Sequence, residues 1–194
     1  MALINYPKRE IIYKIVYYGT GLGGKTTNLK YIYDHLEPQD RGELVQLRTE
    51  TERTLFFDYL PIELTSVHGF KTRFALYTVP GQWEYNESRR MILKGADGII
   101  FVADSNATRS RENIDAVQNM IDNLAEHKLK IESMPLVLQY NKRDLLDAMP
   151  IGRLERELNP WGVPSFEAVA LEGKSVFATL KALAKLVVNQ APKL

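Results

Sequence analysis

Residues 11–26 read IIYKIVYYGTGLGGKT, an apolar stretch that runs into a glycine-rich loop. The first half, Ile11 to Tyr18, is rich in β-branched and aromatic residues, which is typical of a buried strand. The second half, Gly19 to Thr26, matches the phosphate-binding pattern G-x-x-x-x-G-K-S/T. Glycines let successive backbone N–H groups curl around a phosphate, and the N-terminus of a following helix adds partial positive charge. These residues therefore predict a strand, a phosphate-binding loop and a helix, in that order.

The phosphate-binding loop assigns roles to individual residues. Lys25 is expected to reach the β- and γ-phosphates of a nucleotide, and the Thr26 hydroxyl to ligate Mg²⁺. A flexible glycine turn without a ligand is the alternative, and the order of strand, loop and helix argues against it. The pattern alone does not distinguish ATP from GTP. The nucleotide-binding residues expected in this loop are Gly19, Thr20, Gly21, Leu22, Gly23, Gly24, Lys25, Thr26 and Thr27.

Strand-like and helical segments alternate along the chain. This alternation implies a mostly parallel central sheet with helices on both faces, an α/β fold of the P-loop NTPase type. We expect one domain over residues 1–194, because the sequence contains no linker, internal repeat or low-complexity tract. After the first strand, residue patterns predict strands over 54–64, 71–79, 98–104, 136–140 and 165–170, and helices over 25–35, 111–127 and 175–189.

A second motif, Asn141-Lys142-Arg143-Asp144, follows the strand predicted at 136–140. The Asp144 carboxylate can accept hydrogen bonds from both N1–H and N2–H₂ of guanine, a donor pattern that adenine lacks. Asn141 can bond the base edge and the phosphate-binding loop, while the Lys142 stem lies along the purine ring. An isolated NKxD tetrapeptide is usually a solvated turn. Because this NKRD motif follows a strand in a chain that also has a phosphate-binding loop, it favours GTP and GDP as the ligands.

Composition and charge exclude several functions. Lys and Arg total 25 and Asp and Glu 24, so the net charge of +1 gives no reason to expect a nucleic-acid partner. The absence of cysteine excludes disulfides, thiolate metal sites and prenyl or palmitoyl anchors. No apolar run approaches the roughly 18 residues of a membrane span, and we see no signal peptide before the first strand. We expect a cytoplasmic protein with no direct membrane anchor.

A third loop, Thr78 to Gln82 (TVPGQ), completes a resemblance to the Ras-like small GTPases, which carry DxxGQ at this place. The resemblance covers nearly the whole chain. It is closer still to the bacterial MglA-type branch of that family, which is associated with cell polarity and gliding motility. The segments that carry it include LINY, KIVYYG, TETERTLFFD, LYTVPGQ and QYNKRDL.

The resemblance implies roles for five more residues. Gln82 corresponds to the glutamine that orients the attacking water, and the Gly81 N–H to the sensor of the γ-phosphate. Thr54 resembles the threonine that closes on Mg²⁺ in the triphosphate state. Arg53 resembles an arginine finger supplied by the same chain, although an ordinary exposed basic residue is the alternative. Ala170 is the one residue of EAVAL that matches the loop contacting the base.

The chief departure from the family pattern is Thr78, which stands where an aspartate usually holds Mg²⁺ through water. Asp58 is a candidate replacement, and a surface carboxylate at a strand end is the alternative. Trp83 suits either a partner surface or the core. The residues from Arg109 to Arg111 are expected on a solvated helix face.

The resemblance implies a switch that binds GTP or GDP with Mg²⁺ and hydrolyses GTP. Hydrolysis would be slow alone and accelerated by an MglB-like activator of the roadblock fold. Downstream effectors would read switch segments at about 38–57 and 80–94, and partners would recruit the protein to a cell pole. An ATP-using kinase or ATPase is one alternative, which leaves NKRD and PGQ unexplained. A structural module locked onto its nucleotide is another, and it leaves Lys25 and Gln82 without a purpose.

Overall fold

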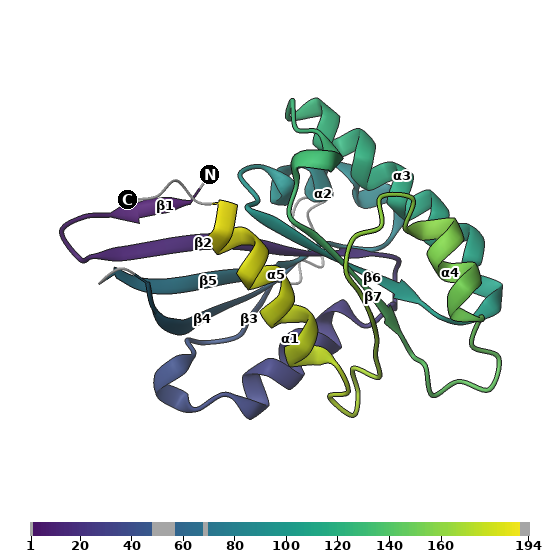
Figure 1. Cartoon of the computed structure of the whole chain (residues 1–194), viewed down its shortest axis with the longest axis horizontal. Helices are drawn as coiled ribbons and strands as arrows, with labels where there is room; N and C mark the ends of the chain where they lie inside the picture. Colours follow the sequence, from purple (N-terminus) through teal and green to yellow (C-terminus); the bar gives the residue numbers. More distant parts are fainter. Residues whose placement is uncertain (1, 48–56, 68–69, 191–194) are drawn as a thin grey trace.

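The computed structural model describes residues 2–47, 57–67 and 70–190. One sheet has the strand order β3-β4-β5-β2-β6-β7-β8, and β1 pairs with β2 beside this path (Figure 1). The strands are β1 (Leu3–Asn5), β2 (Glu10–Gly19), β3 (Val45–Leu47), β4 (Phe57–Val67), β5 (Phe70–Thr78), β6 (Gly98–Asp104), β7 (Leu136–Asn141) and β8 (Ser165–Glu167).

The centre of the sheet is parallel, as predicted. Strand β2 runs parallel to β5 and β6, β6 to β7, and β7 to β8. The antiparallel pairs are β1 with β2, β3 with β4, and β4 with β5. Every residue of β6 and β7 is buried, as expected for strands that helices cover on both faces. The predicted α/β fold with a mostly parallel central sheet is confirmed.

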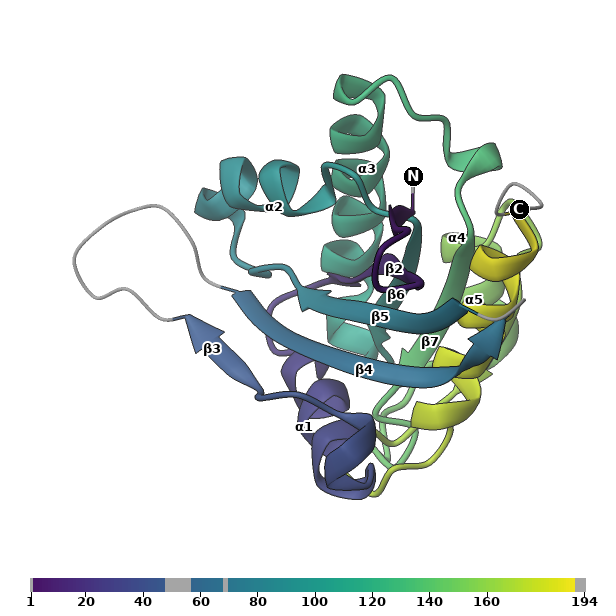
Figure 2. The ribbon, with the colours of Figure 1, turned by 90° about the vertical axis from the view of Figure 1, so that its left-hand side faces the viewer.

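Helices cover both faces of the sheet (Figure 2). On one face α1 (Lys25–His35) and α5 (Val176–Gln190) form a hydrophobic cluster with the sheet. On the other face α2 (Asn86–Leu93), α3 (Ser110–Glu126) and α4 (Ile151–Leu158) form a second cluster. The side chains of β2 alternate between them: Tyr17 joins the first cluster, and Val16 and Tyr18 join the second.

Some element boundaries differ from the sequence predictions. The strand predicted to reach residue 170 ends at Glu167. Beyond it the Val169 N–H donates to the carbonyl of Lys174 at 3.3 Å, and the Ala170 N–H donates to the side chain of Asn141 at 2.8 Å. The strand predicted at 54–64 is present as β4, and residues 54–56 lie outside the described part. The patterns do not predict α2, α4, β1 or β3, because elements this short repeat an apolar period too few times.

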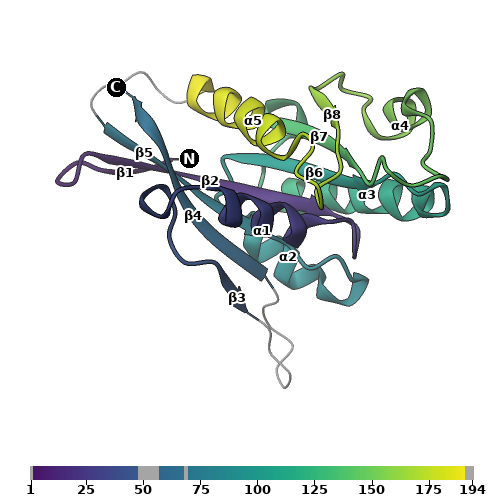
Figure 3. The same ribbon diagram turned by 90° about the horizontal axis from the view of Figure 1, so that it is seen from below.

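The three predicted loops follow the carboxyl ends of β2, β5 and β7, which lie at one edge of the sheet because these strands run in the same direction. Helix α1 starts at Lys25, so the last two residues of the phosphate-binding motif form its first turn, and it doubles back along β2 (Figure 3). Ligand sites of open α/β sheets form at this edge.

Candidate functional site

Lys25 is a buried cation at the phosphate-binding loop. Its ammonium donates to the carbonyls of Gly19 at 3.0 Å and Thr20 at 2.5 Å. The pKa of Lys25 is lowered to about 7, chiefly by burial and also by the positive charge of Arg89, while the negative charge of Asp58 acts in the opposite direction. A buried ammonium that donates to carbonyl groups, with a second cation nearby, gains strongly from an added anion.

Asn141 joins the phosphate-binding loop to the end of β7. Its Nδ2 donates to the carbonyl of Gly23 at 2.9 Å, and its Oδ1 accepts from the Ala170 N–H at 2.8 Å. Gly24 has a φ of 102°, and a Cβ there would lie 2.1 Å from Asn141 Nδ2. Glycine is therefore required at this position, both for its backbone conformation and for the approach of Asn141.

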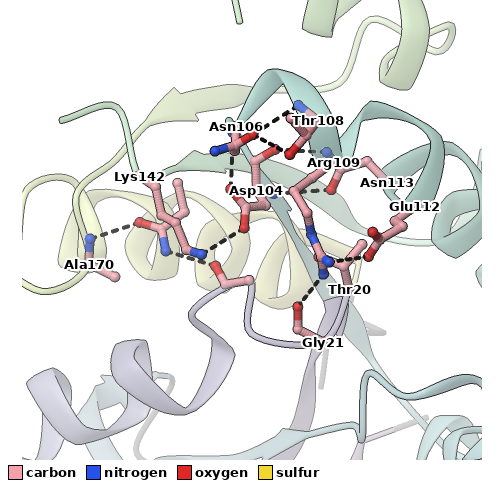
Figure 4. Close-up of polar contacts among 12 residues, drawn as sticks. Thr20, Gly21, Asp104, Asn106, Thr108, Arg109, Glu112, Asn113, Lys142 and Ala170 are labelled. Carbon is pink, nitrogen blue, oxygen red and sulfur yellow. Dashed lines mark hydrogen bonds and ion pairs between the residues drawn. The ribbon is translucent and has the colours of Figure 1, made fainter. Parts of the chain in front are cut away.

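Asp104 holds the Asn141–Asp144 loop from a second direction (Figure 4). The Lys142 ammonium donates to the Asp104 carboxylate at 2.7 Å, and Asp104 is 2% exposed. Asp144 is exposed, so its carboxylate can accept hydrogen bonds from a ligand. The sequence analysis missed Asp104. Its signal is an acidic residue that ends a fully apolar strand, next to Asn141 in the parallel β6–β7 register.

Arg109 contacts the phosphate-binding loop, so the prediction of a solvated face from Arg109 to Arg111 is wrong at its first residue. Its guanidinium donates to the carbonyl of Gly21 at 2.8 Å and pairs with Glu112 at 2.6 Å (Figure 4). Arg111 pairs with Asp115 on α3 and is exposed as expected. Only the tertiary contact of Arg109 with Gly21 distinguishes it from Arg111.

Asp58 lies beside Thr26, and the alternative of a surface carboxylate is wrong. Asp58 is 8% exposed, and the Thr26 hydroxyl donates to its carboxylate at 2.5 Å. The Thr78 hydroxyl donates to the same carboxylate at 2.9 Å, and Gln46 Nε2 donates to its other oxygen at 3.0 Å. Strands β4 and β5 are antiparallel, with Tyr59 opposite Tyr77, which brings Asp58 next to Thr78. A carboxylate from the neighbouring strand thus stands beside Thr78, where the family pattern has its own aspartate.

Arg89 holds the loop that carries Gln82. This arginine of α2 is 4% exposed and donates to the carbonyls of Pro80, Gln82 and Trp83, and to the Asn119 side chain. Among the described residues it forms no ion pair with a carboxylate. The sequence analysis missed Arg89, since an arginine on an amphipathic helix is usually solvated.

The backbone of Gly81 lies against the phosphate-binding loop. A Cβ at Gly81 would lie 2.2 Å from the Gly21 nitrogen, so no other residue fits there without a shift. Gln82 is exposed next to this contact, and Trp83 is 72% exposed, so the alternative that Trp83 packs in the core is wrong.

Two cavities bring the phosphate-binding loop together with the loop that carries Gln82, and neither is lined by the Asn141–Asp144 loop or by Ala170. One of about 450 Å³ lies beside Gly19, Thr20 and Gln82. The other, of about 340 Å³, is lined by Gly21, Leu22, Gly24, Lys25, Thr26, Thr27, Asp58, Thr78 and Gly81.

Arg53 and Thr54 lie outside the described residues. Within the part of the chain that is described, no three His, Asp or Glu side chains are grouped to hold a metal. Nor does any described helix have the length and apolarity to cross a membrane.

Comparisons with known proteins agree with this arrangement. The model of the Ras family matches residues 14–189. The chain is also 52% identical over 193 residues to the mutual gliding-motility protein MglA of Myxococcus xanthus (strain DK1622), a similarity that covers 100% of this chain and 99% of that protein. A family match over most of the chain and a relative this similar over its full length lead to one conclusion. The chain belongs to the Ras family of small GTPases and is an MglA-like member of it.

Proposed function

We propose that this GTPase is a molecular switch for cell polarity or motility, that residues 1–194 act as one G domain, and that partners recognise its nucleotide state. Membership of the Ras family implies guanine-nucleotide binding and GTP hydrolysis. The observation that carries the proposal is the meeting of three loops, after β2, β5 and β7, at one edge of the sheet. The similarity to a gliding-motility protein supports the cellular role.

In this proposal each loop binds a different part of the nucleotide. Residues Gly19 to Thr27 bind the phosphates, with Lys25 as the cation that neutralises them. Asp144 accepts from guanine, Lys142 lies along the base, and the Ala170 segment contacts its edge. The Asn141 bonds to Gly23 and Ala170 support this division, because they hold the phosphate and base sites in one frame.

Mg²⁺ fits the oxygen atoms of Thr26 and Asp58. A hydroxyl and one carboxylate are hard oxygen donors, and Mg²⁺ at phosphates typically takes one or two carboxylates plus water and phosphate oxygens. The metal would supply charge neutralisation at the phosphates. We propose Thr26 and Asp58 as its ligands, with Thr54 joining in the triphosphate state and Thr78 orienting Asp58 through the 2.9 Å hydrogen bond.

We expect Asp58→Asn to lower the Mg²⁺ affinity of the GDP-bound protein by at least the about 10- to 100-fold that the loss of a partner outside the first coordination shell costs. The amide keeps the shape of the side chain but loses its charge. Adding Thr78→Asp should restore part of the affinity, since it returns a carboxylate to the adjacent strand position. The measurement is the rate of GDP release as free Mg²⁺ is titrated, with Glu63→Gln, on the same strand, as the control. A wild-type Mg²⁺ dependence in Asp58→Asn would remove Asp58 from the metal site.

Hydrolysis follows from positioning and charge stabilisation. Gln82 orients the attacking water, while Lys25 and Arg53 stabilise negative charge that develops on the transferred phosphoryl group. The Gly81 N–H senses the γ-phosphate. The contact of the Gly81 backbone with Gly21, and the hold of Arg89 on the carbonyls around it, support a position for this loop beside the phosphates.

The proposed function is tested by phosphate release from GTP with and without an MglB-like activator. We expect slow release by the protein alone and acceleration by the partner. Gln82→Leu should retain GTP but hydrolyse it about 10²-fold more slowly with the activator present, since it loses water orientation and no phosphate contact. Glu84→Gln, a change on the same exposed loop, serves as the control. Equal single-turnover rates for wild type and Gln82→Leu would exclude Gln82 from catalysis.

Partners would read the surface beside the 80–83 loop. Trp83 is 72% exposed and Met91, on α2, is 53% exposed, so large apolar side chains are available to a partner. We propose that an MglB-like roadblock-fold activator and downstream effectors bind here, and that such partners bring a cytoplasmic protein to a cell pole.

A further inference from the structure

Three fully buried polar side chains lie where α1, β7 and α5 meet. Asn28, Gln139 and Thr179 are each 0% exposed. Asn28 and Gln139 exchange two hydrogen bonds, from Asn28 Nδ2 to Gln139 Oε1 at 2.7 Å and from Gln139 Nε2 to Asn28 Oδ1 at 3.0 Å. Gln139 Nε2 also donates to the Thr179 hydroxyl at 3.2 Å, and that hydroxyl donates to the carbonyl of Ser175 at 2.6 Å. The side chains of one helix, one strand and a second helix are thus joined in a line.

Stability alone does not account for this group. Each of its polar atoms has a hydrogen-bond partner, so the group is tolerated in the core. Hydrophobic side chains of similar volume would fill the same space at equal or better stability, because the desolvation of buried polar groups offsets much of what their hydrogen bonds gain. What directional bonds add to a packed core is one defined arrangement of the elements they join.

The arrangement joined here is that of the nucleotide loops. Gln139 lies two residues before Asn141 on β7, so both side chains are on the same face of the strand. Asn141 bridges Gly23 and Ala170. Gln139, which lies further from the loop, connects Asn28 on α1 to Thr179 on α5. The Asn28 N–H and Nδ2 both donate to the carbonyl of Gly24 at 3.0 Å. From the same strand, Asn141 thus cross-links the loops that precede α1 and α5, and Gln139 cross-links the two helices themselves.

We propose that Asn28 and Gln139 are positioning residues that keep the phosphate and guanine loops in a fixed relative placement, so that both ends of a bound nucleotide are held together and dissociation is slow. This inference rests on the proposed division of the nucleotide between the two loops. A ligand that bridges two sites gains affinity when their separation is fixed before it binds, because less motion is lost on binding.

The test separates placement from stability with Asn28→Leu, Gln139→Met and their double variant, which keep the side-chain volumes. Each single change leaves a buried amide without its partner and should lower the unfolding temperature of the nucleotide-free protein. The double variant should regain that temperature. It should nevertheless release fluorescently labelled GDP about tenfold faster than wild type, the size of effect expected from residues that couple two sites. Release within twofold of wild type by a double variant of restored stability would overturn the proposal.

A matched pair of threonine variants keeps the test decisive if the double variant does not fold. Thr179→Val removes one hydrogen bond of Gln139 and preserves shape, so GDP release should quicken by about two- to threefold. Thr72→Val is the control, since Thr72 is a buried residue of β5 whose hydroxyl has no partner in the described part of the chain. Equal release by both variants and wild type would overturn the proposal. Failure of the wild type itself to retain GDP would instead contradict the proposed function.

Discussion

Asp144→Asn is expected to change the nucleotide preference of the protein from guanosine to xanthosine nucleotides. The wild-type carboxylate accepts from two guanine donors, and an amide places a donor against one of them. The loss of GTP affinity should reach about 10⁴-fold, as expected where hydrogen-bonding groups that the bound ligand covers are left without a partner. Xanthine, which carries an oxygen in place of the guanine amino group, should regain much of this loss. Calorimetric titration with GTP, XTP and ATP measures each preference.

Asp147→Asn is the control for this experiment. Asp147 is an exposed carboxylate in the same loop region, and it accepts from Asn106 Nδ2 at 2.7 Å, a bond that an amide oxygen can also accept. The Asp147→Asn substitution changes the net charge by the same amount as Asp144→Asn and should leave the nucleotide preference unchanged. Equal affinity of the wild-type protein for ATP and GTP would show that the assignment of the Asn141–Asp144 loop is wrong.

Arg53→Ala is expected to lower activator-stimulated GTP turnover by about 10³-fold or more while nucleotide affinity changes little. If Arg53 is a finger supplied by the same chain, its guanidinium stabilises charge that develops only in the transition state, so its loss affects the chemical step alone. Single-turnover hydrolysis with saturating activator measures the rate, and GDP release measures binding. Arg156→Ala, at an exposed arginine of α4, is the control.

Substitutions in the activator test the same assignment from the partner's side. Replacement of every exposed arginine of the partner should leave stimulation largely intact, because the chain supplies its own cation. Normal turnover by Arg53→Ala, together with a requirement for partner arginines, would assign the finger to the partner and leave Arg53 as a surface residue.

Long elements with strong patterns could be predicted from sequence. Strand β6 has the predicted bounds, Gly98–Asp104, because a strand covered on both faces needs a continuous apolar run. Helix α3 lies within one residue of its predicted bounds, since an apolar stripe repeats along its length. The eight-residue helices α2 and α4 were missed, because two turns do not establish a period.

The candidate site was predictable where it consists of local motifs. The phosphate-binding loop and the NKRD motif are each a continuous run of residues. Their function depends on backbone conformations that the residues themselves favour, such as the left-handed turn at Gly24. Strand order then places both loops at one edge. Local motifs and patterns were thus enough to predict the fold class, the family resemblance and the expected class of ligand.

The contacts between residues far apart in the chain could not be predicted, because they depend on the assembled fold. Asp58 reaches Thr26, 32 positions away, because antiparallel pairing of β4 with β5 brings it beside Thr78. Gln139 meets Asn28 across 111 positions and Thr179 across 40. Local sterics and periodicity set the conformation of a segment, but which side chains face one another depends on strand register and helix packing. Those contacts form only when the whole core assembles.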